Sequence, residues 1–435
     1  MHTIQQLQSG ELLGAKRIKI SENLTSIPPE LYQLADTLEV LDLSGNALIS
    51  LPNEFLCFTN LRILFLSNNK FKIFPSILGT LSNLDIIGFK ANLITEIPEQ
   101  SLPVSLRWLI LTDNKIKELP RSIGLCVKLQ KVMLAGNMLS CLPDEMALCL
   151  NIELLRISAN KLQALPTWIL SLPKLAWLAS AGNPCTFKSD EQKFQTDVIS
   201  WDSIAIKEQL GEGASGVIYK ATLNDSDLDI AVKIFKGAVT SDGFPEDEMK
   251  ACIEAGLHQN LVPVKAVISN HPNNKEGLVM DLIPSSYTNL GLPPDFVTCT
   301  RDMFSDGKVF SINAIVHIAQ GIASVATQLH EKGIMHGDLY AHNILVNEEY
   351  HPLFGDFGAA TMYSIKDIDL AERLEKIEVR AYGCLLEDLL RLVLDKSRDE
   401  IACLENLKNQ CLQVNIESRP TFKSILAKIA TEFNK

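Results

Sequence analysis

Several common signatures are missing from this 435-residue sequence, and each absence argues against a class of protein. The first residues, Met-His-Thr-Ile-Gln-Gln, contain neither the basic nor the apolar segment of a secretory signal. No uninterrupted apolar run approaches the roughly 20 residues of a membrane span. The net charge of -12 argues against dominant electrostatic binding to nucleic acid or anionic membrane. We therefore expect a cytoplasmic protein with no membrane span and no nucleic-acid partner.

The ten cysteines form no C-x-x-C pair. Metal sites need clustered ligands, and secreted disulfide frameworks need an export signal. The sequence therefore favours neither a zinc site nor disulfide bonds. Cys57, Cys126, Cys141 and Cys149 fall on or beside periodic apolar positions. We therefore expect these cysteines to be reduced core residues.

An asparagine recurs along the first half of the chain at intervals of 23 residues, with one interval of 22. The recurring residues are Asn23, Asn46, Asn69, Asn92, Asn114, Asn137, Asn160 and Asn183. A full repeat reads L-x-x-L-x-L-x-x-N, and a proline usually follows in L-P or I-P. Over residues 15–185 this pattern resembles leucine-rich repeats. One strand and one turn cannot bury their apolar face alone, so we expect stacked units in which the asparagines bond the backbone of the turns.

The strand residues between the buried leucines should line the concave face of such an array, and here they are unusually apolar. A large exposed apolar surface usually marks an interaction site. We therefore expect a protein partner or substrate on this face. The residues expected to bind it are Ile63, Phe65, Trp108, Ile110, Met133, Arg156 and Trp177. The alternative is that the face packs against the rest of the chain or a second copy.

The second half of the chain opens with a glycine-rich turn between two strand-like runs. Residues 210–221 read L-G-E-G-A-S-G-V-I-Y-K-A. Glycines in such a turn let backbone amides approach a triphosphate without a clashing Cβ. A Rossmann turn would be followed by a helix, whereas Val217, Ile218 and Tyr219 continue as a strand.

Three further motifs follow in order. Ile-Ala-Val-Lys ends at Lys233, and the helical stretch beyond it holds Glu248 and a less favoured candidate, Glu254. His-Gly-Asp-Leu-Tyr-Ala-His-Asn occupies residues 336–343, and Gly-Asp-Phe-Gly occupies residues 355–358. Together with the glycine-rich turn, this set resembles protein kinases. We therefore expect a multidomain α/β chain, with a leucine-rich-repeat solenoid followed by a bilobal protein-kinase fold of the α+β type.

The resemblance implies a role for each polar residue of the set. Lys233, oriented by Glu248, would bind the α- and β-phosphates of ATP. Asp338 would orient the acceptor hydroxyl and accept its proton, while Asn343 and Asp356 would hold Mg²⁺. The full set of expected nucleotide contacts is Leu210, Gly211, Glu212, Gly213, Ala214, Ser215, Gly216, Val217, Ile218, Ala231, Lys233, Met280, Asp281, Leu282 and Leu345. In this set Met280 would be the gatekeeper.

The resemblance also implies a division of the chain. We expect an amino-terminal cap at residues 1–14, repeats at 15–185, a linker at 186–200 and a kinase domain at 201–435. Ile-Ser-Trp at residues 199–201, where the expected kinase domain begins, and Arg-Pro-Thr-Phe at residues 419–422, near its end, are most similar to the tyrosine-kinase-like group. That similarity implies transfer to serine or threonine. The two-module layout resembles soluble repeat-kinases of bacteria.

The sequence departs from the kinase pattern in three places. Gly337 stands where an arginine usually precedes the catalytic aspartate, so we expect no strict activation by loop phosphorylation. Tyr340 replaces a lysine near the transferring phosphoryl group, which could slow the reaction. The stretch after Gly358 is short and has no A-P-E motif. It is therefore doubtful that this segment can dock a peptide substrate as in other kinases, and Arg419 lacks the glutamate with which it would usually pair.

These departures keep two alternatives open: a small-molecule phosphotransferase of kinase-like fold, and a catalytically weak pseudokinase scaffold. Three hydroxyls in the short segment, those of Thr361, Tyr363 and Ser364, are candidate autophosphorylation sites.

Overall fold

The chain falls into two compact units. The computed structural model describes all residues except 187–196, 214, 225–227, 237–238, 241, 396–398 and 434–435. The first unit comprises residues 1–174 with 183–185, and the second comprises residues 175–182 with 186–435. The second unit thus includes a segment from the end of the range expected to be repeats.

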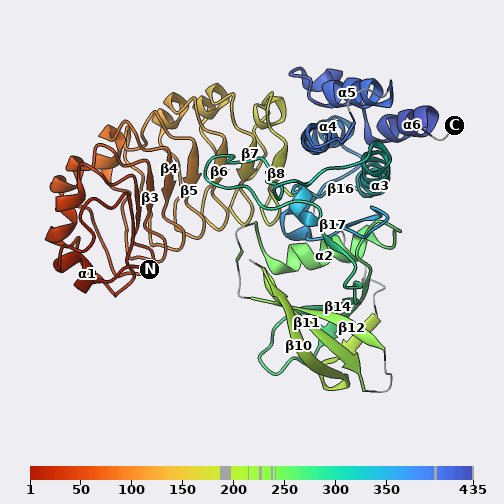
Figure 1. Cartoon of the computed structure of the whole chain (residues 1–435), viewed down its shortest axis with the longest axis horizontal. Coiled ribbons are helices and arrows are strands. Elements are labelled where there is room, and N and C mark those ends of the chain that lie inside the picture. Colours follow the sequence, from red (N-terminus) through yellow and green to blue (C-terminus); the bar gives the residue numbers. More distant parts are fainter. Residues whose placement is uncertain are drawn as a thin grey trace. The chain divides into compact units, whose positions relative to one another are not determined.

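The first unit is a stack of short parallel strands, most of them joined through 3-10 turns (Figure 1). Each strand is three residues long and pairs in register with the next, as Ile63, Ile86 and Trp108 do across three repeats. A short helix, α1 (Ile4–Gln8), precedes the strands. The strands are β1 (Arg17–Lys19), β2 (Val40–Asp42), β3 (Ile63–Phe65), β4 (Ile86–Gly88), β5 (Trp108–Ile110), β6 (Lys131–Met133) and β7 (Leu154–Arg156). The 3-10 turns are η1 (Pro29–Leu34), η2 (Asn53–Cys57), η3 (Ser76–Thr80), η4 (Arg121–Leu125), η5 (Asp144–Leu148) and η6 (Ile169–Ser171).

The recurring asparagines form a buried ladder. At Asn114 the side-chain Oδ1 accepts from the amide of Ile94 at 3.0 Å, and Nδ2 donates to the carbonyls of Phe89 and Leu111 at 2.9 and 3.0 Å. Equivalent bonds occur at Asn46, Asn69, Asn92, Asn137, Asn160 and Asn183. Asn23 differs, because it is exposed and has a left-handed backbone with φ of 57°. The seven buried asparagines therefore stabilise the turns, since a buried backbone group without a hydrogen-bond partner destabilises the fold.

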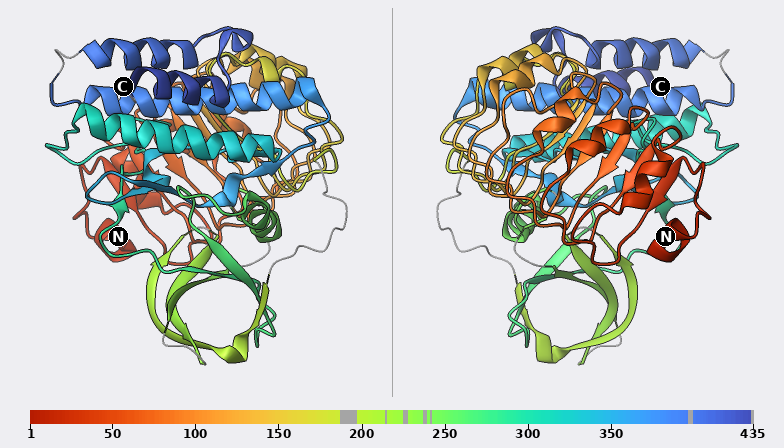
Figure 2. Two further views of the ribbon diagram at one scale, coloured as in Figure 1. Left: turned by 90° about the vertical axis from the view of Figure 1, so that its right-hand side faces the viewer. Right: turned by 90° about the vertical axis from the view of Figure 1, so that its left-hand side faces the viewer.

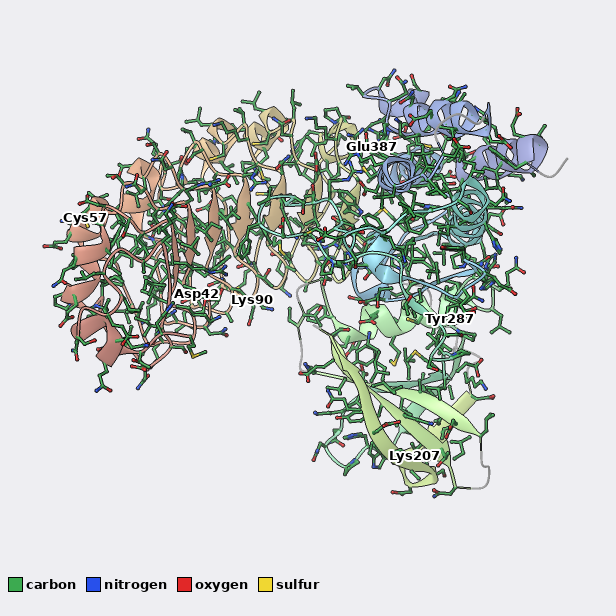
Figure 3. All side chains as sticks on the ribbon, in the orientation of Figure 1. Asp42, Cys57, Lys90, Lys207, Tyr287 and Glu387 are labelled. Atoms are coloured by element: carbon green, nitrogen blue, oxygen red, sulfur yellow. The ribbon has the colours of Figure 1, made fainter. Side chains whose placement is uncertain are left out.

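The four cysteines of this unit that were expected to be core residues divide into two kinds. Cys126 and Cys149 are buried, and burial raises the pKa of their thiols to about 12 and about 11. Cys57 and Cys141 are exposed, and Figure 3 shows Cys57 at the edge where the 3-10 turns lie. The expectation of a core position was therefore wrong for these two, because each sits at a position of its repeat that faces outward.

A curled six-stranded sheet forms one lobe of the second unit (Figure 2). Its strands are ordered β10-β11-β12-β14-β13-β9, with β9 parallel to β13 and the other pairs antiparallel. The bounds are β9 (Asp197–Ser200), η7 (Trp201–Ser203), β10 (Ile204–Glu212), β11 (Gly216–Leu223), β12 (Asp229–Phe235), β13 (Val264–Ser269) and β14 (Gly277–Asp281), with helix α2 (Pro245–Ala255) after β12. Strand β9 lies inside the range 186–200 expected to be linker, most of which is outside the described residues.

The other lobe is mainly helical, and its long helices pack against one another (Figure 2). Its helices are α3 (Ile312–Glu331), α4 (Ile368–Arg391), α5 (Asp399–Cys411) and α6 (Phe422–Phe433), with 3-10 turns η8 (Ala341–Asn343), η9 (Phe357–Ala359) and η10 (Ile416–Ser418). Its short strands are β15 (Thr288–Asn289), β16 (Ile334–Met335), β17 (Ile344–Val346), β18 (Pro352–Phe354) and β19 (Thr361–Met362). Strand β8 (Trp177–Ala179) also belongs to the second unit.

Helix α3 is long and apolar enough to cross a membrane by length and composition alone. Its most apolar window is 61% buried within the protein, as expected for the core helix of a globular domain. The helix is capped by Ser311, whose side chain accepts a hydrogen bond from the amide of Ala314 at 3.2 Å.

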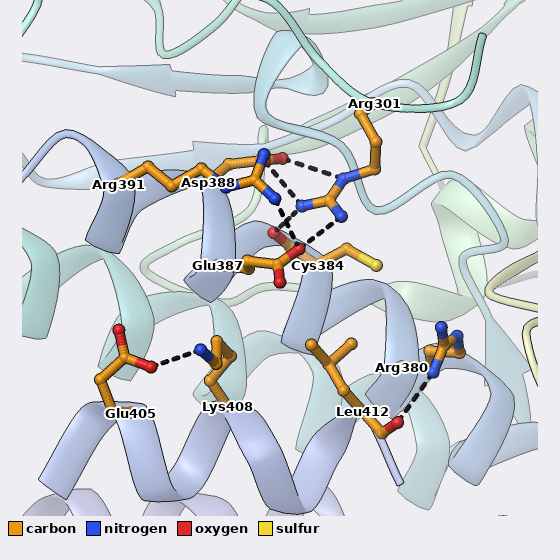
Figure 4. A network of polar contacts seen from close by, with 9 residues as sticks. All are labelled: Arg301, Arg380, Cys384, Glu387, Asp388, Arg391, Glu405, Lys408 and Leu412. Carbon is orange, nitrogen blue, oxygen red and sulfur yellow. Dashed lines mark hydrogen bonds and ion pairs between the residues drawn. The ribbon is translucent and has the colours of Figure 1, made fainter. Parts of the chain in front are cut away.

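A charged network attaches the loop before α3 to helix α4 (Figure 4). Arg301 donates from Nη1 to Glu387 and from Nη2 to Asp388, both at 2.6 Å, and Nη2 also donates to the carbonyl of Cys384 at 2.9 Å. Bidentate arginine contacts of this kind fix direction as well as distance. The network therefore holds the neighbouring Asp302 in place beside residues 341–343.

Candidate active site

A buried ion pair joins the sheet to helix α2. Lys233 lies on β12 between Ile218 of β11 and Leu278 of β14, and its Nζ pairs with Glu248 of α2. The two side chains are 11% and 2% exposed. Burial by itself would lower the pKa of Lys233, but the carboxylates of Glu248 and Asp356 outweigh it and raise that pKa. The lysine therefore stays cationic, and its partner is Glu248 rather than Glu254.

Residues 336–343 form a loop in which two polar side chains hold each other. Asn343 donates from Nδ2 to the carbonyl of Asp338 at 3.0 Å and to its carboxylate Oδ2 at 2.9 Å. The amide is thereby oriented, so its carbonyl oxygen is the atom that can ligate a metal. His336 donates from Nε2 to the carbonyl of Gly355 at 3.0 Å, and burial lowers the pKa of this histidine. The neutral ring therefore ties this loop to the Gly-Asp-Phe-Gly turn.

Asp356 has an unusual backbone. Its φ of 59° and ψ of 76° lie in the left-handed region, which is sparsely populated for residues other than glycine and is found more often for aspartate than for most. Its carboxylate accepts a hydrogen bond from the amide of Gly358 at 3.4 Å. The next side chain, Phe357, is buried with its ring 4.9 Å from that of His336. This packing holds the Asp356 carboxylate at the cavity described below.

A buried glutamate that we did not predict as a site residue binds the backbone of the loop 336–343. Glu378, in the middle of α4 and 1% exposed, accepts hydrogen bonds from the amides of His336 and Gly337 at 3.2 and 2.7 Å. It also accepts from Nε2 of His330 at 2.8 Å. Burial by itself would raise the pKa of Glu378, but these bonds lower it. The only signal in the sequence was a carboxylate at the start of an apolar helical stretch.

A cavity of about 380 Å³ brings most of the predicted nucleotide contacts together. The predicted residues that line it are Leu210, Gly213, Ser215, Gly216, Ile218, Ala231, Lys233, Glu248, Met280, Asp281, Leu282, Asn343, Leu345 and Asp356. Ala214 lies outside the described residues. Gly211, Glu212 and Val217 are described but do not line the cavity, and Glu212 instead pairs with Lys236.

Several lining residues were missed, among them Val264, Asn289 and His342. His342 bonds through Nδ1 to Asp302 at 2.6 Å, and its amide donates to the same carboxylate at 3.2 Å. Burial by itself would lower the pKa of His342, but Asp302 outweighs it and raises that pKa. Asp302 could not be foreseen, because it contacts His342 from a loop 40 residues away in the sequence.

The segment between the Gly-Asp-Phe-Gly turn and α4 is very short. Helix α4 already begins at Ile368. Of the three candidate autophosphorylation sites, Thr361 and Tyr363 are only 2% and 5% exposed, which argues against modification of these two. The hydroxyl of Tyr363 is held by Nδ1 of His330 at 2.7 Å. Arg419 donates to backbone carbonyls at Gln413 and Lys376, both at 2.9 Å.

The predicted partner-binding face is less exposed than expected. Ile63, Arg156 and Trp177 are buried, and the other four residues predicted there are only half-buried. Trp177 belongs to the second unit, where its indole N–H donates to the carbonyl of Leu339 at 3.0 Å. A role for Trp177 in binding a separate partner is therefore excluded by its contacts, and the alternative of packing within the chain holds for this residue.

The polar residues of the cavity suit Mg²⁺ only in combination with a phosphate ligand. Among the described residues, no group of three or more His, Cys, Asp or Glu side chains could hold a metal ion by itself. Mg²⁺ typically keeps several waters and binds through one or two carboxylates plus substrate phosphates. The oriented amide of Asn343 and the carboxylate of Asp356 fit that requirement.

Comparison with known families agrees with this geometry. Residues 204–379 match the family described as Protein kinase domain. Residues 18–71 match the family described as Leucine rich repeat. The chain therefore carries a repeat region followed by a protein kinase domain, as the sequence predicted.

Curated relatives match part of this chain at low identity. Fibroblast growth factor receptor 1 of Dugesia japonica is 25% identical over 50% of this chain and 31% of its own length. A Dictyostelium discoideum protein described as "Probable cyclin-dependent serine/threonine-protein kinase" is 25% identical over 38% of this chain and 24% of its own length. Among solved structures, a Leptospira interrogans LRR protein is 31% identical over 38% of this chain and 48% of its own, with a TM-score of 0.32. The chain thus spans less than a third of the length of these two curated relatives.

Proposed function

We propose that this chain is an ATP-dependent protein kinase that transfers the γ-phosphate to serine or threonine hydroxyls of proteins. The observation that supports this most is the geometry of one cavity. It holds the Lys233–Glu248 ion pair beside Asp356, and its Asn343 is oriented by a bond to Asp338. Such positioning and charge stabilisation provide most of the catalysis of phosphoryl transfer.

Each residue has a role that its contacts support. Lys233 stays cationic and binds phosphate oxygens, while the backbone amides of the glycine-rich turn cradle them. Asp338, restrained by Asn343, orients the acceptor hydroxyl and takes its proton. Mg²⁺, when held by Asn343 and Asp356, would neutralise charge that develops on the phosphates.

The apolar part of the cavity would hold the adenine and exclude water. Leu210, Ile218, Ala231 and Leu345 line it, as does Met280, the proposed gatekeeper. Burial of a flat aromatic base against such side chains favours binding through the hydrophobic effect.

Serine or threonine is the proposed acceptor because of the Arg-Pro-Thr-Phe exit and the Ile-Ser-Trp entry. The names of the curated relatives point to no single acceptor, since one is a growth factor receptor and the other a serine/threonine-protein kinase. A second candidate, transfer to a small hydroxylated molecule, is favoured by one observation. Only residues 360–367 separate η9 from α4, which leaves little chain to dock a peptide.

The test is transfer of labelled γ-phosphate from magnesium ATP to the full-length chain, to a generic basic protein and to small hydroxylated acceptors. Asp338→Asn removes the proposed base, and Asp306→Asn is the matched control at an exposed aspartate. We expect label on serine or threonine that disappears in Asp338→Asn and persists in Asp306→Asn. Label on tyrosine would overturn the acceptor assignment, and label only on small acceptors would support the second candidate. ATP binding without any transfer would indicate a silent scaffold.

We further propose a cytoplasmic location and a protein partner for the repeats. The half-buried residues Phe65, Trp108, Ile110 and Met133 offer an apolar surface that a partner could cover. Cell fractionation tests the location. Replacing these four residues together with serine should abolish capture of a partner identified by crosslinking in cells, and unchanged capture would argue against this face.

A further inference from the structure

Residues 175–182 lie against the active site within the second unit. Trp177 is 2% exposed, and its indole N–H donates to the carbonyl of Leu339, the residue after Asp338, at 3.0 Å. Its ring stacks on Tyr340 with a centroid distance of 4.3 Å and an interplanar angle of 6°. Trp177 therefore holds both residues that follow Asp338, one through its backbone and one through its side chain.

The same segment contacts the strand after the Gly-Asp-Phe-Gly turn. The amide of Ser180 donates to the hydroxyl of Thr361 on β19 at 3.0 Å, and both residues are buried. Strand β19 pairs with β16 just before the loop 336–343, with Thr361 opposite Met335. The Ser180 contact therefore anchors the metal-binding turn from its carboxyl side.

The segment also reaches helix α2. Gly182 has a φ of 73°, and a Cβ there would lie 2.7 Å from Cδ2 of Phe244 and 2.9 Å from Oδ2 of Asp247. Asp247 precedes Glu248, the partner of Lys233, in the first turn of α2. A side chain at residue 182 would thus push on the end of the helix that carries the ion pair.

The position of this segment explains why residue 337 is a glycine. A Cβ at residue 337 would lie 2.4 Å from the carbonyl oxygen of Leu178 and 2.7 Å from that of Ala359. The φ of 73° at Gly337 is a second reason for glycine. An arginine, the residue usual at this position in kinases that depend on a phosphorylated loop, is therefore incompatible with the position of residue 178.

We propose that residues 177–182 act as a built-in clamp that holds the catalytic loop, strand β19 and α2 in the arrangement needed for transfer, with Trp177 as the main positioning residue. This inference rests on the proposed function. The clamp takes the place of a phosphate on the activation segment, so activity should not require phosphorylation there. It also makes the last strand of the repeat region part of the catalytic domain.

The test compares full-length variants. Trp177→Ala removes the clamp contact, Trp177→Phe keeps an aromatic ring but loses the N–H donor, and Thr361→Val removes the acceptor of the Ser180 bond at similar volume. Trp168→Ala is the control, because it removes a half-buried tryptophan that lies in the preceding repeat and belongs to the first unit. Each variant is assayed for kcat, for KM of ATP, and for hydrogen exchange of the amides in residues 336–343.

We expect Trp177→Ala to lower kcat by about tenfold or more with little change in KM of ATP, because misplaced catalytic groups affect transfer more than nucleotide binding. The kcat values of Trp177→Phe and Thr361→Val should lie between those of Trp177→Ala and wild type. Trp168→Ala should have the kcat of wild type. Exchange at residues 336–343 should accelerate in Trp177→Ala only. Unchanged kcat and exchange in Trp177→Ala would overturn the clamp, as would a loss of nucleotide binding equal to the loss of kcat. If wild type transfers no phosphate, the proposed function fails, and the exchange measurement still tests the clamp.

Discussion

Replacing Glu378 with alanine should destabilise the kinase domain severely. The carboxylate accepts from two backbone amides and one histidine nitrogen, all within 3.2 Å, and the glutamate is 1% exposed. Leaving a buried donor without its acceptor costs about 1–3 kcal/mol per group. Because the three donors share one carboxylate, we expect the free energy of unfolding to fall by about 3–5 kcal/mol rather than by the full sum.

The measurement is urea unfolding of the full-length chain, followed through hydrogen exchange of peptides from α3 and α4. These peptides report the kinase domain alone, which matters because the two units need not unfold together. The free energy of unfolding of Glu378→Gln should lie between those of Glu378→Ala and wild type, because the glutamine amide keeps one acceptor oxygen. Glu372→Ala, at an exposed glutamate of the same helix, should change stability by less than about 0.5 kcal/mol.

The pH dependence gives an independent test. The pKa of Glu378 is lowered in the folded chain, so its stabilising contribution is complete above the ordinary glutamate value of about 4.3 and is lost as the pH falls through the lowered pKa. The stability difference between wild type and Glu378→Ala should therefore shrink in acid. A difference under 1 kcal/mol at neutral pH, or one that stays constant into acid, would refute the reasoning about these hydrogen bonds.

Three further predictions follow from other contacts. Glu248→Gln should lower kcat/KM about 10- to 100-fold in the phosphotransfer assay, because it removes the charge that orients the phosphate-binding lysine, whereas Glu254→Gln should not. Asn114→Ala should lower the free energy of unfolding of the repeat unit by about 2–4 kcal/mol in urea titration followed by circular dichroism, since it breaks three buried hydrogen bonds. Asp302→Asn should lower the melting temperature more at pH 6 than at pH 9. The raised pKa of His342 means that the ion pair stabilises fully below about 6.5 and less as the pH rises through that pKa.

The sequence alone determined the repeats, because their period comes from a local rule. Each repeat must supply buried leucines and an asparagine at fixed positions, and the same contacts recur from one unit to the next. The active-site residues Lys233, Asp338, Asn343 and Asp356 could also be found, since each lies in a short motif whose order along the chain is characteristic.

Only the tertiary structure decided which side chains serve these motifs from a distance. Glu378 lies 41 residues beyond the Gly337 amide that it binds, and Trp177 lies 162 residues before the Leu339 carbonyl. Nothing local in the sequence marks such a contact, because a buried carboxylate or tryptophan has the same neighbours in sequence whatever it meets in space. The burial of Thr361 was missed for the same reason. Periodic and motif-based features depend on local geometry, whereas support of the active site depends on long-range packing.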